Sequence, residues 1–254
     1  MAGPLVQPLL LLLLSFALGS AGQEAQDTGE RIINGIVCPG GSHPWQVALY
    51  DNNEVCAGVL VNQQWVLTVA HCHQRYGKGE PAPDLLVDWR AQRIRATEYF
   101  IHPRYNNRTN NHDIMLVKLH SPATLSPTVN TIYLPSSCKG SGTSCTVSGW
   151  GITTKDGATK PSELMCSNVN IISAQECKQS YRALLRKYML CAAAPNGLSN
   201  SCKGDSGSPL ICEGSLQGLV SAGHFPCILP FKPVIYTRLC MYRKWLYNTM
   251  KANS

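Results

Sequence analysis

Short apolar runs alternate with turn residues along most of the chain. The runs 45–50, 65–69, 114–119 and 216–220 are each five or six residues long, and Gly, Pro, Asn and Ser recur between them. Runs of this length with this punctuation are typical of β-strands. Because they do not alternate with helical segments, the pattern favours an all-β barrel or sandwich over repeated β/α units.

Helical periodicity is confined to two segments. Ser173-Ala-Gln-Glu176 is a capping box that continues through Cys177, so it predicts the start of a helix. Near the end of the chain, Met241, Trp245 and Thr249 recur at four-residue spacing and predict a terminal helix. No internal repeat or low-complexity linker divides the sequence.

The first 22 residues are typical of a secretory signal. Leu9 to Leu14 is an unbroken leucine run, too short to span a bilayer, and the small residues Ser20, Ala21 and Gly22 suit a signal peptidase. We therefore expect a signal peptide over 1–22 and a secreted, extracellular protein with no membrane anchor.

Composition limits the remaining possibilities. A chain of 254 residues with 44% hydrophobic and 15% charged residues can bury a sizeable core, which excludes a disordered protein. The 21 glycines and 16 prolines indicate a loop-rich chain and not a helical bundle. The net charge of +7 includes arginine clusters near 90–95 and 182–187. Because neither cluster has interleaved aromatic residues, we interpret them as solvated surface and expect no nucleic-acid partner.

The twelve cysteines predict a disulfide framework, because secretion leads to an oxidising compartment. Their spacing alone does not determine which cysteine pairs with which. A zinc site is the weaker explanation: the sequence has no Cys-x-x-Cys, and His71-Cys72-His73 has no spacing that lets three side chains meet one tetrahedral ion. We expect no metal and no cofactor.

Three segments carry residue types suited to nucleophilic catalysis. His71 follows the apolar run 65–69, Asp113 precedes the run 114–119, and Ser206 lies within Gly204-Asp-Ser-Gly207. Attack by a hydroxyl needs a base, a carboxylate that orients the base, and donors for the developing oxyanion. Each segment alone has an ordinary structural explanation as a strand end, a turn or a loop. The order His, Asp, Ser along the chain is that of chymotrypsin-type proteases.

With these motifs the chain resembles the trypsin-like serine proteases, and among them the kallikrein-related peptidases, across 32–254. The motifs that carry the resemblance are Arg31-Ile-Ile-Asn-Gly35, Ser42-His-Pro-Trp-Gln-Val47, Trp65-Val-Leu-Thr-Val-Ala-His-Cys72, Asp113-Ile-Met-Leu-Val-Lys118, Thr146-Val-Ser-Gly-Trp-Gly151 and Cys202-Lys-Gly-Asp-Ser-Gly207.

The resemblance implies an all-β fold of two packed six-stranded antiparallel barrels with a C-terminal helix. It places an activation propeptide at 23–31 and the protease domain at 32–254, with the first barrel at 32–135 and the second barrel and the helix at 136–254. It also implies six disulfides: Cys38–Cys166, Cys56–Cys72, Cys138–Cys240, Cys145–Cys212, Cys177–Cys191 and Cys202–Cys227.

The same resemblance implies a role for each site residue. Ser206 is the nucleophile, His71 the general base, and Asp113 orients the imidazole, while the backbone N–H groups of Gly204 and Ser206 form the oxyanion hole. Cleavage after Arg31 frees the amine of Ile32, which then pairs with Asp205.

The resemblance also implies a substrate pocket with Asn200 at its base and with Ser221, Ala222, Gly223 and Val234 beside it. Asn200 offers no buried anion to a lysine or arginine side chain, whose desolvation is therefore not repaid. Val234 stands where the family pattern has a glycine, so we expect it to narrow the pocket. We expect cleavage after small to medium apolar residues, so a different, trypsin-like protease must cut after Arg31.

Two functions stay open, because the sequence departs from the family pattern at four positions. These positions are Ala57, Ser208, Ala222 and Val234. The first function is an active secreted endopeptidase. The second is a catalytically weak or inactive homologue that acts as a binding or decoy protein. The expected partners are protein or peptide substrates, the activating protease and protein protease inhibitors, and the expected state is a monomer without a membrane partner. The sequon Asn107-Arg-Thr109 predicts a glycan at Asn107.

Overall fold

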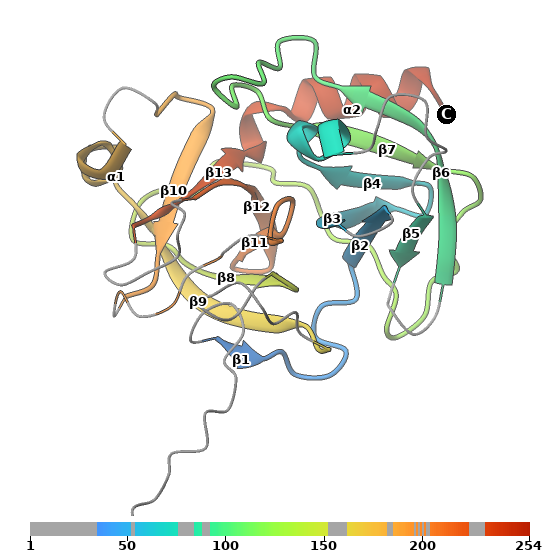
Figure 1. The fold of residues 1–254 in the computed structure, drawn as a ribbon, viewed down its shortest axis with the longest axis horizontal. Coiled ribbons are helices and arrows are strands. Elements are labelled where there is room, and N and C mark those ends of the chain that lie inside the picture. Colours follow the sequence, from blue (N-terminus) through green and yellow to red (C-terminus); the bar gives the residue numbers. More distant parts are fainter. Residues whose placement is uncertain are drawn as a thin grey trace, which may run out of the picture.

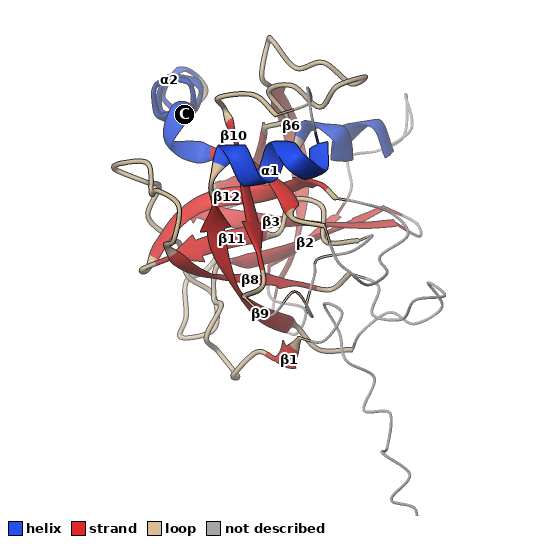
Figure 2. Cartoon of the chain, turned by 90° about the vertical axis from the view of Figure 1, so that its left-hand side faces the viewer, coloured by secondary structure: helices blue, strands red, loops and turns tan. Residues whose placement is uncertain are grey.

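The computed structural model of the chain describes residues 35–51, 54–75, 84–87, 92–151, 162–181, 185–195, 197, 199, 201, 204–223 and 232–254. Strands dominate these residues and form two sheets, while both α-helices lie outside the sheets (Figures 1 and 2). The apolar runs of the sequence at 45–50, 65–69, 114–119 and 216–220 all coincide with strands.

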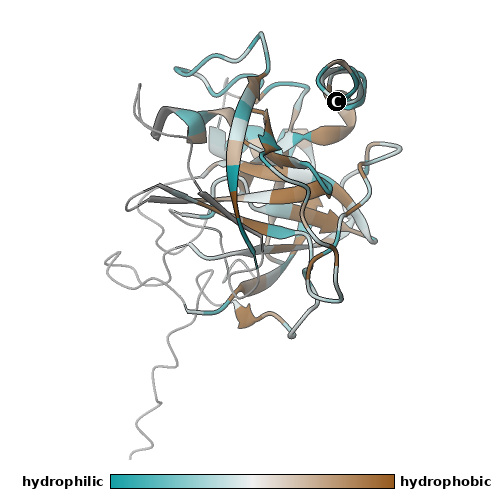
Figure 3. Ribbon diagram, turned by 90° about the vertical axis from the view of Figure 1, so that its right-hand side faces the viewer, coloured by the Kyte–Doolittle hydropathy of each residue, from teal (hydrophilic) through white to brown (hydrophobic). Residues whose placement is uncertain are grey.

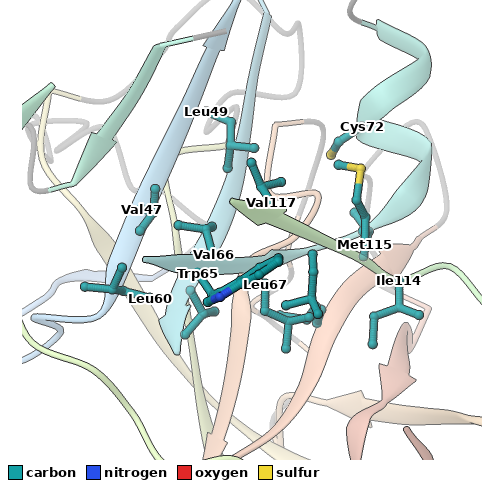
Figure 4. Close-up of a cluster of buried hydrophobic side chains, with 14 of the residues drawn as sticks. Val47, Leu49, Leu60, Trp65, Val66, Leu67, Cys72, Ile114, Met115 and Val117 are labelled. Atoms are coloured by element: carbon teal, nitrogen blue, oxygen red, sulfur yellow. The ribbon is translucent and has the colours of Figure 1, made fainter. Parts of the chain in front are cut away.

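Six strands close the first barrel, all of them antiparallel to their neighbours. In order around the barrel they are β2 (Gln46–Asp51), β3 (Glu54–Asn62), β4 (Trp65–Thr68), β7 (Met115–Leu119), β6 (Gln92–Ile101) and β5 (Asp84–Val87). Their apolar side chains meet in the interior, where Leu49, Leu60 and Leu67 are fully buried (Figure 4). This core fixes the strand ends that carry the candidate residues.

Seven strands form the second sheet, in the order β1 (Ile36–Val37), β9 (Met165–Ile172), β10 (Met189–Ala193), β13 (Val234–Arg238), β12 (Ser215–Ala222), β11 (Pro209–Cys212) and β8 (Ser144–Gly149). Because β9 also pairs with β8, six of these strands close on themselves and β1 is added outside β9. The expected fold of two six-stranded antiparallel barrels is confirmed.

β1 lies in a different barrel from the one expected from its place in the chain. The expected first-barrel range begins at residue 32, yet Ile36 pairs with Cys166 of the second sheet. The disulfide between Cys38 and Cys166 and the hydrogen bond from Cys38 N to Leu164 O (2.9 Å) hold the segment there. The start of the described chain is therefore fixed to the barrel that carries Ser206.

Helix α1 (Ala174–Tyr181) begins where the capping box predicts, and Ser173 Oγ accepts a hydrogen bond from Glu176 N at 3.1 Å. Helix α2 (Arg243–Ala252) follows a short 3₁₀ turn, η3 (Leu239–Met241), so Met241 belongs to the turn and not to the predicted helix. Leu246 is fully buried and attaches α2 to the first-barrel core. Figure 3 shows the hydrophobic strands inside and hydrophilic loops around them.

Five disulfides connect the described residues: Cys38–Cys166, Cys56–Cys72, Cys138–Cys240, Cys145–Cys212 and Cys177–Cys191. These pairs agree with the pairing that the resemblance implies. The sixth expected pair, Cys202–Cys227, lies outside the described residues. Among the helices described, none has the length and apolar character needed to cross a bilayer.

Candidate active site

His71 lies in a short 3₁₀ segment, η1 (Ala70–Arg75), directly after β4. Val69 and Ala70 before it are fully buried, and the disulfide of Cys72 to Cys56 joins the segment to β3. The chain is therefore fixed on both sides of the histidine. The imidazole itself keeps 15% of its surface exposed, so it is open to a substrate.

The carboxylate of Asp113 is almost fully buried and has three hydrogen-bond donors. Oδ1 accepts from His71 N at 2.9 Å, and Oδ2 lies 2.7 Å from His71 Nδ1 and accepts from Ser221 Oγ at 2.7 Å. The backbone carbonyl of Asp113 accepts from Thr237 Oγ1 at 2.6 Å. Donors from both barrels thus fix one carboxylate, and they compensate for its burial by hydrogen bonding to its charged form.

His71 connects this carboxylate to Ser206. Its Nε2 lies 2.8 Å from Ser206 Oγ, while Nδ1 faces Asp113. With Asp113 ionised, the neutral imidazole carries its proton on Nδ1, so Nε2 accepts the hydrogen bond of the serine hydroxyl. The structure therefore brings together three residues that lie far apart in the sequence, in the geometry of an activated nucleophile.

The loop of Ser206 requires glycine at both of its ends. Gly204 and Gly207 have φ values of 100° and 83°, a region that other residues rarely adopt. A side chain at Gly207 would also meet the carbonyl oxygen of Ala57 and the hydroxyl of Thr68. Ala57 N donates to Ser206 O at 2.7 Å, which ties this second-barrel loop to β3 of the first barrel.

Comparison with known proteins decides the family. The family model described as Trypsin matches residues 32–246. Human kallikrein-7 is 53% identical over 254 residues, all of both chains, and rat cationic trypsin-3 is 41% identical over 96% of this chain and 99% of its own. The chain belongs to the trypsin family of serine proteases.

Its kallikrein-related character is equally plain. Human kallikrein-14 is 40% identical over 96% of this chain and 94% of its own. The solved structure of mouse neuropsin, a serine protease expressed in the limbic system of mouse brain, has a TM-score of 0.79 and 38% identity, covering 86% of this chain and 99% of that chain. The protein is thus a kallikrein-related serine endopeptidase.

Asp205 of this protease is fully buried next to Ser206. Its Oδ1 accepts from Gly151 N at 2.8 Å, and a Cβ on Gly151 would lie 2.5 Å from the carboxyl carbon. A Cβ on Gly149 would also meet this carboxylate. The two glycines therefore allow the carboxylate to enter a space that any side chain there would fill. Arg31 and Ile32, its expected activation partners, lie outside the described residues.

The expected substrate pocket of the protease is described on one side. Ser221 and Ala222 end β12, Val234 begins β13, and Ala222 pairs with Ile235. Val234 is only 3% exposed and packs within the second-barrel core, while nothing lies within 4 Å of a Cβ built on Gly223. Asn200, the expected base of the pocket, lies outside the described residues.

The departures Ala57 and Ser208 fit into the structure differently. Ala57 is 1% exposed, and its methyl group is accommodated while its backbone holds Ser206. Ser208 is fully buried, and its Oγ has no hydrogen-bond partner in the described part of the chain. This hydroxyl lies 2.7 Å from the position of a Cβ on Gly149 and so shares the space next to Asp205.

The sequence did not predict two hydrogen-bond partners of Asp113. Thr237 binds the backbone of Asp113, and Ser221, expected only as a substrate-binding residue, also donates to the Asp113 carboxylate. Both lie more than one hundred positions after Asp113, so no local pattern marks them as its partners. Only the folded contact between the barrels shows these roles.

Within the described ranges, one cluster has three potential metal ligands whose ligand atoms lie within 4.8 Å of one another. It consists of Cys38, His43 and Cys166. Both cysteines are joined to each other in a disulfide, so neither offers the thiolate that zinc binds. Burial lowers the pKa of His43, and its Nε2 lies 3.5 Å from Cys166 Sγ. These residues therefore do not fit a zinc site.

Proposed function

We propose that this protease is a secreted endopeptidase, synthesised as a zymogen, that cuts peptide bonds after small to medium apolar residues. The observation that carries the proposal is the continuous set of hydrogen bonds from buried Asp113 through His71 to Ser206. In this proposal the signal peptide covers 1–22, the propeptide 23–31 and the protease domain 32–254.

The three residues have distinct roles in the proposed reaction. Ser206 Oγ attacks the carbonyl carbon of the peptide bond while His71 Nε2 takes its proton. The oxyanion accepts from the N–H groups of Gly204 and Ser206, and His71 returns the proton to the leaving amine, which leaves an acyl-enzyme. Water then attacks the ester by the same steps and restores Ser206. Asp113 keeps the proton on Nδ1 and stabilises the transient imidazolium.

Activation is proposed to follow cleavage after Arg31. A buried carboxylate is stable only with charged or hydrogen-bonding partners, and the new α-ammonium group of Ile32 supplies a positive charge for Asp205. The burial of Asp205 between Gly149 and Gly151 supports this assignment. The family match that begins at residue 32 supports the same cleavage position.

The proposed specificity rests on Asn200 and Val234. Asn200 carries no charge to pair with a substrate lysine or arginine, and the buried side chain of Val234 occupies space that a glycine leaves open. A protease with this pocket does not cut after its own Arg31. An activating trypsin-like protease is therefore a required partner in this proposal.

Two assays test these points directly. Purified proenzyme incubated alone should keep its original amino terminus, and addition of trypsin should expose Ile-Ile-Asn-Gly. If Ile-Ile-Asn-Gly arises spontaneously in the wild type but not in Ser206→Ala, self-activation occurs and the proposal is wrong. A peptide-library profile of the activated enzyme should show cutting after Ala, Val or Leu, whereas dominant cutting after Arg or Lys contradicts the pocket assignment.

A second candidate function is that of a binding or decoy protein with weak catalysis. Ala222 favours it, since the side chain at this position is too small to form a large apolar wall against a substrate. The hydroxyl of Ser208, which lacks a hydrogen-bond partner within the described residues, adds a buried polar group next to Asp205. A fluorophosphonate probe separates the two functions, because it labels only an activated serine.

The proposal also includes a glycan and a set of partners. Asn107 is exposed, and the neighbouring Asn106 Oδ1 accepts from Arg108 N and Thr109 N at 3.0 and 3.2 Å, so the sequon lies in an ordered surface turn. Amidase treatment of the cell-secreted protein should increase its gel mobility, and unchanged mobility contradicts the glycan. The proposed partners are protein or peptide substrates and protein protease inhibitors, and the proposed state is a monomer.

A further inference from the structure

The residue before Asp113 has an unusual backbone conformation. His112 has a φ of 53°, in the left-handed region that residues with a side chain rarely occupy. Its carbonyl accepts from Ile114 N at 2.9 Å, which closes a tight turn around Asp113. Such a conformation persists only where surrounding contacts hold it in place. The direction of the Asp113 side chain depends on this turn.

The ring of His112 supplies these contacts. It stacks on His102 with ring centres 4.9 Å apart and on Tyr188 with ring centres 3.9 Å apart. Its Nδ1 lies 3.1 Å from the hydroxyl of Tyr242, which precedes α2. Three separate parts of the chain therefore hold one side chain: the segment after β6, the residues before β10 and the start of α2 (Figure 1).

His102 extends the same cluster. Its backbone N donates to Ile114 O at 3.1 Å, so it also binds the turn around Asp113. Its ring meets the rings of Tyr242 and Trp245 at 5.3 and 5.1 Å. The two histidines thus link the helix α2 to both ends of the turn.

The charged and titratable groups around the cluster favour neutral histidines. Burial, and after it the charge of Arg104, lowers the pKa of His112. Burial, His112 and Arg104 together lower the pKa of His102 to about 4. On the other side, burial raises the pKa of Tyr242, with smaller contributions from Tyr188 and Asp113. At neutral pH, a neutral phenol therefore meets a neutral imidazole, and their hydrogen bond involves no net charge.

We propose that His112 is a positioning residue for catalysis: held by the Tyr242 hydroxyl and by the stacked rings, it keeps the turn in the conformation that directs the Asp113 carboxylate at His71. This inference rests on the proposed role of Asp113 as the residue that orients His71. His112 does not contact the substrate. It acts through Asp113, whose Oδ2 lies 2.7 Å from His71 Nδ1.

The test uses the full secreted chain, cleaved after Arg31, and the rate of labelling by a fluorophosphonate probe. Tyr242→Phe removes one hydroxyl and keeps the ring, so the maximal labelling rate should fall about threefold to tenfold, the effect of one hydrogen bond. His112→Asn keeps a residue that tolerates positive φ but removes the stacked ring, so its loss should be larger. The double variant should be no slower than His112→Asn, because both changes remove the same bond.

A matched control is Tyr247→Phe. Tyr247 lies on the exposed side of α2, 61% exposed, and its ring contact with Lys251 does not need the hydroxyl. This variant should label like the wild type. The probe concentration that gives half-maximal rate should not change in any variant, since the substrate side is untouched. The low-field proton resonance of the His71–Asp113 hydrogen bond should shift in the His112 and Tyr242 variants only.

Two results overturn the inference. One is an unchanged labelling rate in both His112→Asn and Tyr242→Phe. The other is a reduced rate that comes with a raised half-maximal probe concentration, an unshifted resonance and a lower melting temperature, which indicates a general loss of structure. The variant Asp113→Asn separates this inference from the proposed function. If Asp113→Asn labels at the wild-type rate, the proposed role of Asp113 is wrong. If Asp113→Asn labels slowly and the His112 and Tyr242 variants do not, only the proposed role of His112 is wrong.

Discussion

The catalytic side and the substrate side of the active site differ in how well they keep the family pattern. On the catalytic side, the Asp113 carboxylate has three donors, and His71 meets both Asp113 and Ser206 at hydrogen-bonding distance. On the substrate side, Ala222 stands where the family pattern has a tryptophan, and Val234 stands where it has a glycine. We therefore propose that the chemistry of the three hydrogen-bonded residues is kept, although Ala57 and Ser208 depart from the family pattern near Ser206, while the surface that selects the substrate is changed.

The difference follows from the physics of the two regions. An unpaired buried charge costs several kcal/mol, so we expect substitutions that remove a hydrogen-bond partner of the Asp113 carboxylate to be costly. An apolar pocket changes its preference by only about 1–3 kcal/mol for each group added or removed. We therefore expect substitution of Ala222 or Val234 to change which substrate is cut and to leave the reaction intact, unlike substitution of Ser221, which also donates to Asp113.

The largest expected effect comes from a substitution on the catalytic side. Asp113→Asn keeps the shape of the side chain but forces the wrong tautomer on His71, so kcat should fall about ten-thousand-fold, a magnitude known from the equivalent change in this family. Steady-state kinetics on a peptide substrate after cleavage at Arg31 measures it. The variant should keep the melting temperature of the wild type within a few degrees. A loss of less than tenfold means that the hydrogen bond from His71 to Asp113 is not used in the reaction.

The next largest effect is expected from a substitution that enlarges the proposed substrate pocket. Val234→Gly removes a buried side chain that we propose borders the pocket, so kcat/KM for substrates with Phe or Tyr at the cleaved position should rise roughly 10–200-fold. The same variant should not gain activity after Arg, because Asn200 still supplies no negative charge to pair with the guanidinium. Equal gains on Phe and Arg substrates indicate a general change in the loop and contradict the proposed role of Val234.

A smaller effect is expected from a large apolar side chain at position 222, on the substrate side. Ala222→Trp adds a large apolar surface beside Gly223, and kcat/KM should rise about tenfold, from roughly 1–2 kcal/mol of buried apolar contact. The gain should appear as a lower KM with an unchanged kcat, since the wall binds substrate and transition state alike. Ala222→Leu should give an intermediate gain. A tryptophan that raises kcat alone contradicts the separation of the two sides.

The smallest effect concerns acid stability next to the catalytic side. The pKa of His102 is lowered to about 4 in the folded protein, so the unfolded chain binds more protons between the ordinary histidine value of about 6.5 and pH 4. Folding stability therefore decreases as the pH falls through this window. In His102→Asn the drop in melting temperature between pH 7 and 4.5 should be smaller, while exposed His120→Asn should match the wild type. A wild-type-like drop in His102→Asn contradicts the burial of a neutral His102.

The sequence identified the three side chains that the structure brings together, but not the residues that hold them. Strand-length apolar runs place His71 after one strand and Asp113 before another, and the glycines that adopt positive φ around Ser206 are visible in Gly204-Asp-Ser-Gly207. Local patterns of this kind depend on neighbours in the chain, so sequence reasoning detects them. The order His, Asp, Ser and the resemblance then combine them into one site.

Contacts between distant segments were not predictable in this way. Thr237 and Tyr242 act on residues more than one hundred positions away, and no periodicity marks them. The pairing of Ile36 with Cys166 on the second sheet likewise follows from no local pattern, and only the neighbouring disulfide Cys38–Cys166 was implied by the resemblance. Contributions to a site from across the barrel interface require the structure.

The central claim, that the catalytic side is intact although the substrate side has changed, is tested most directly by active-site labelling. The full chain, cleaved after Arg31 and checked by amino-terminal sequencing, is treated with a fluorophosphonate probe, and the fraction of labelled protein is measured. We predict nearly complete labelling of the cleaved chain, none in Ser206→Ala and little in the uncleaved chain. Absence of labelling in a correctly cleaved and folded wild-type chain contradicts the claim and supports a binding or decoy protein.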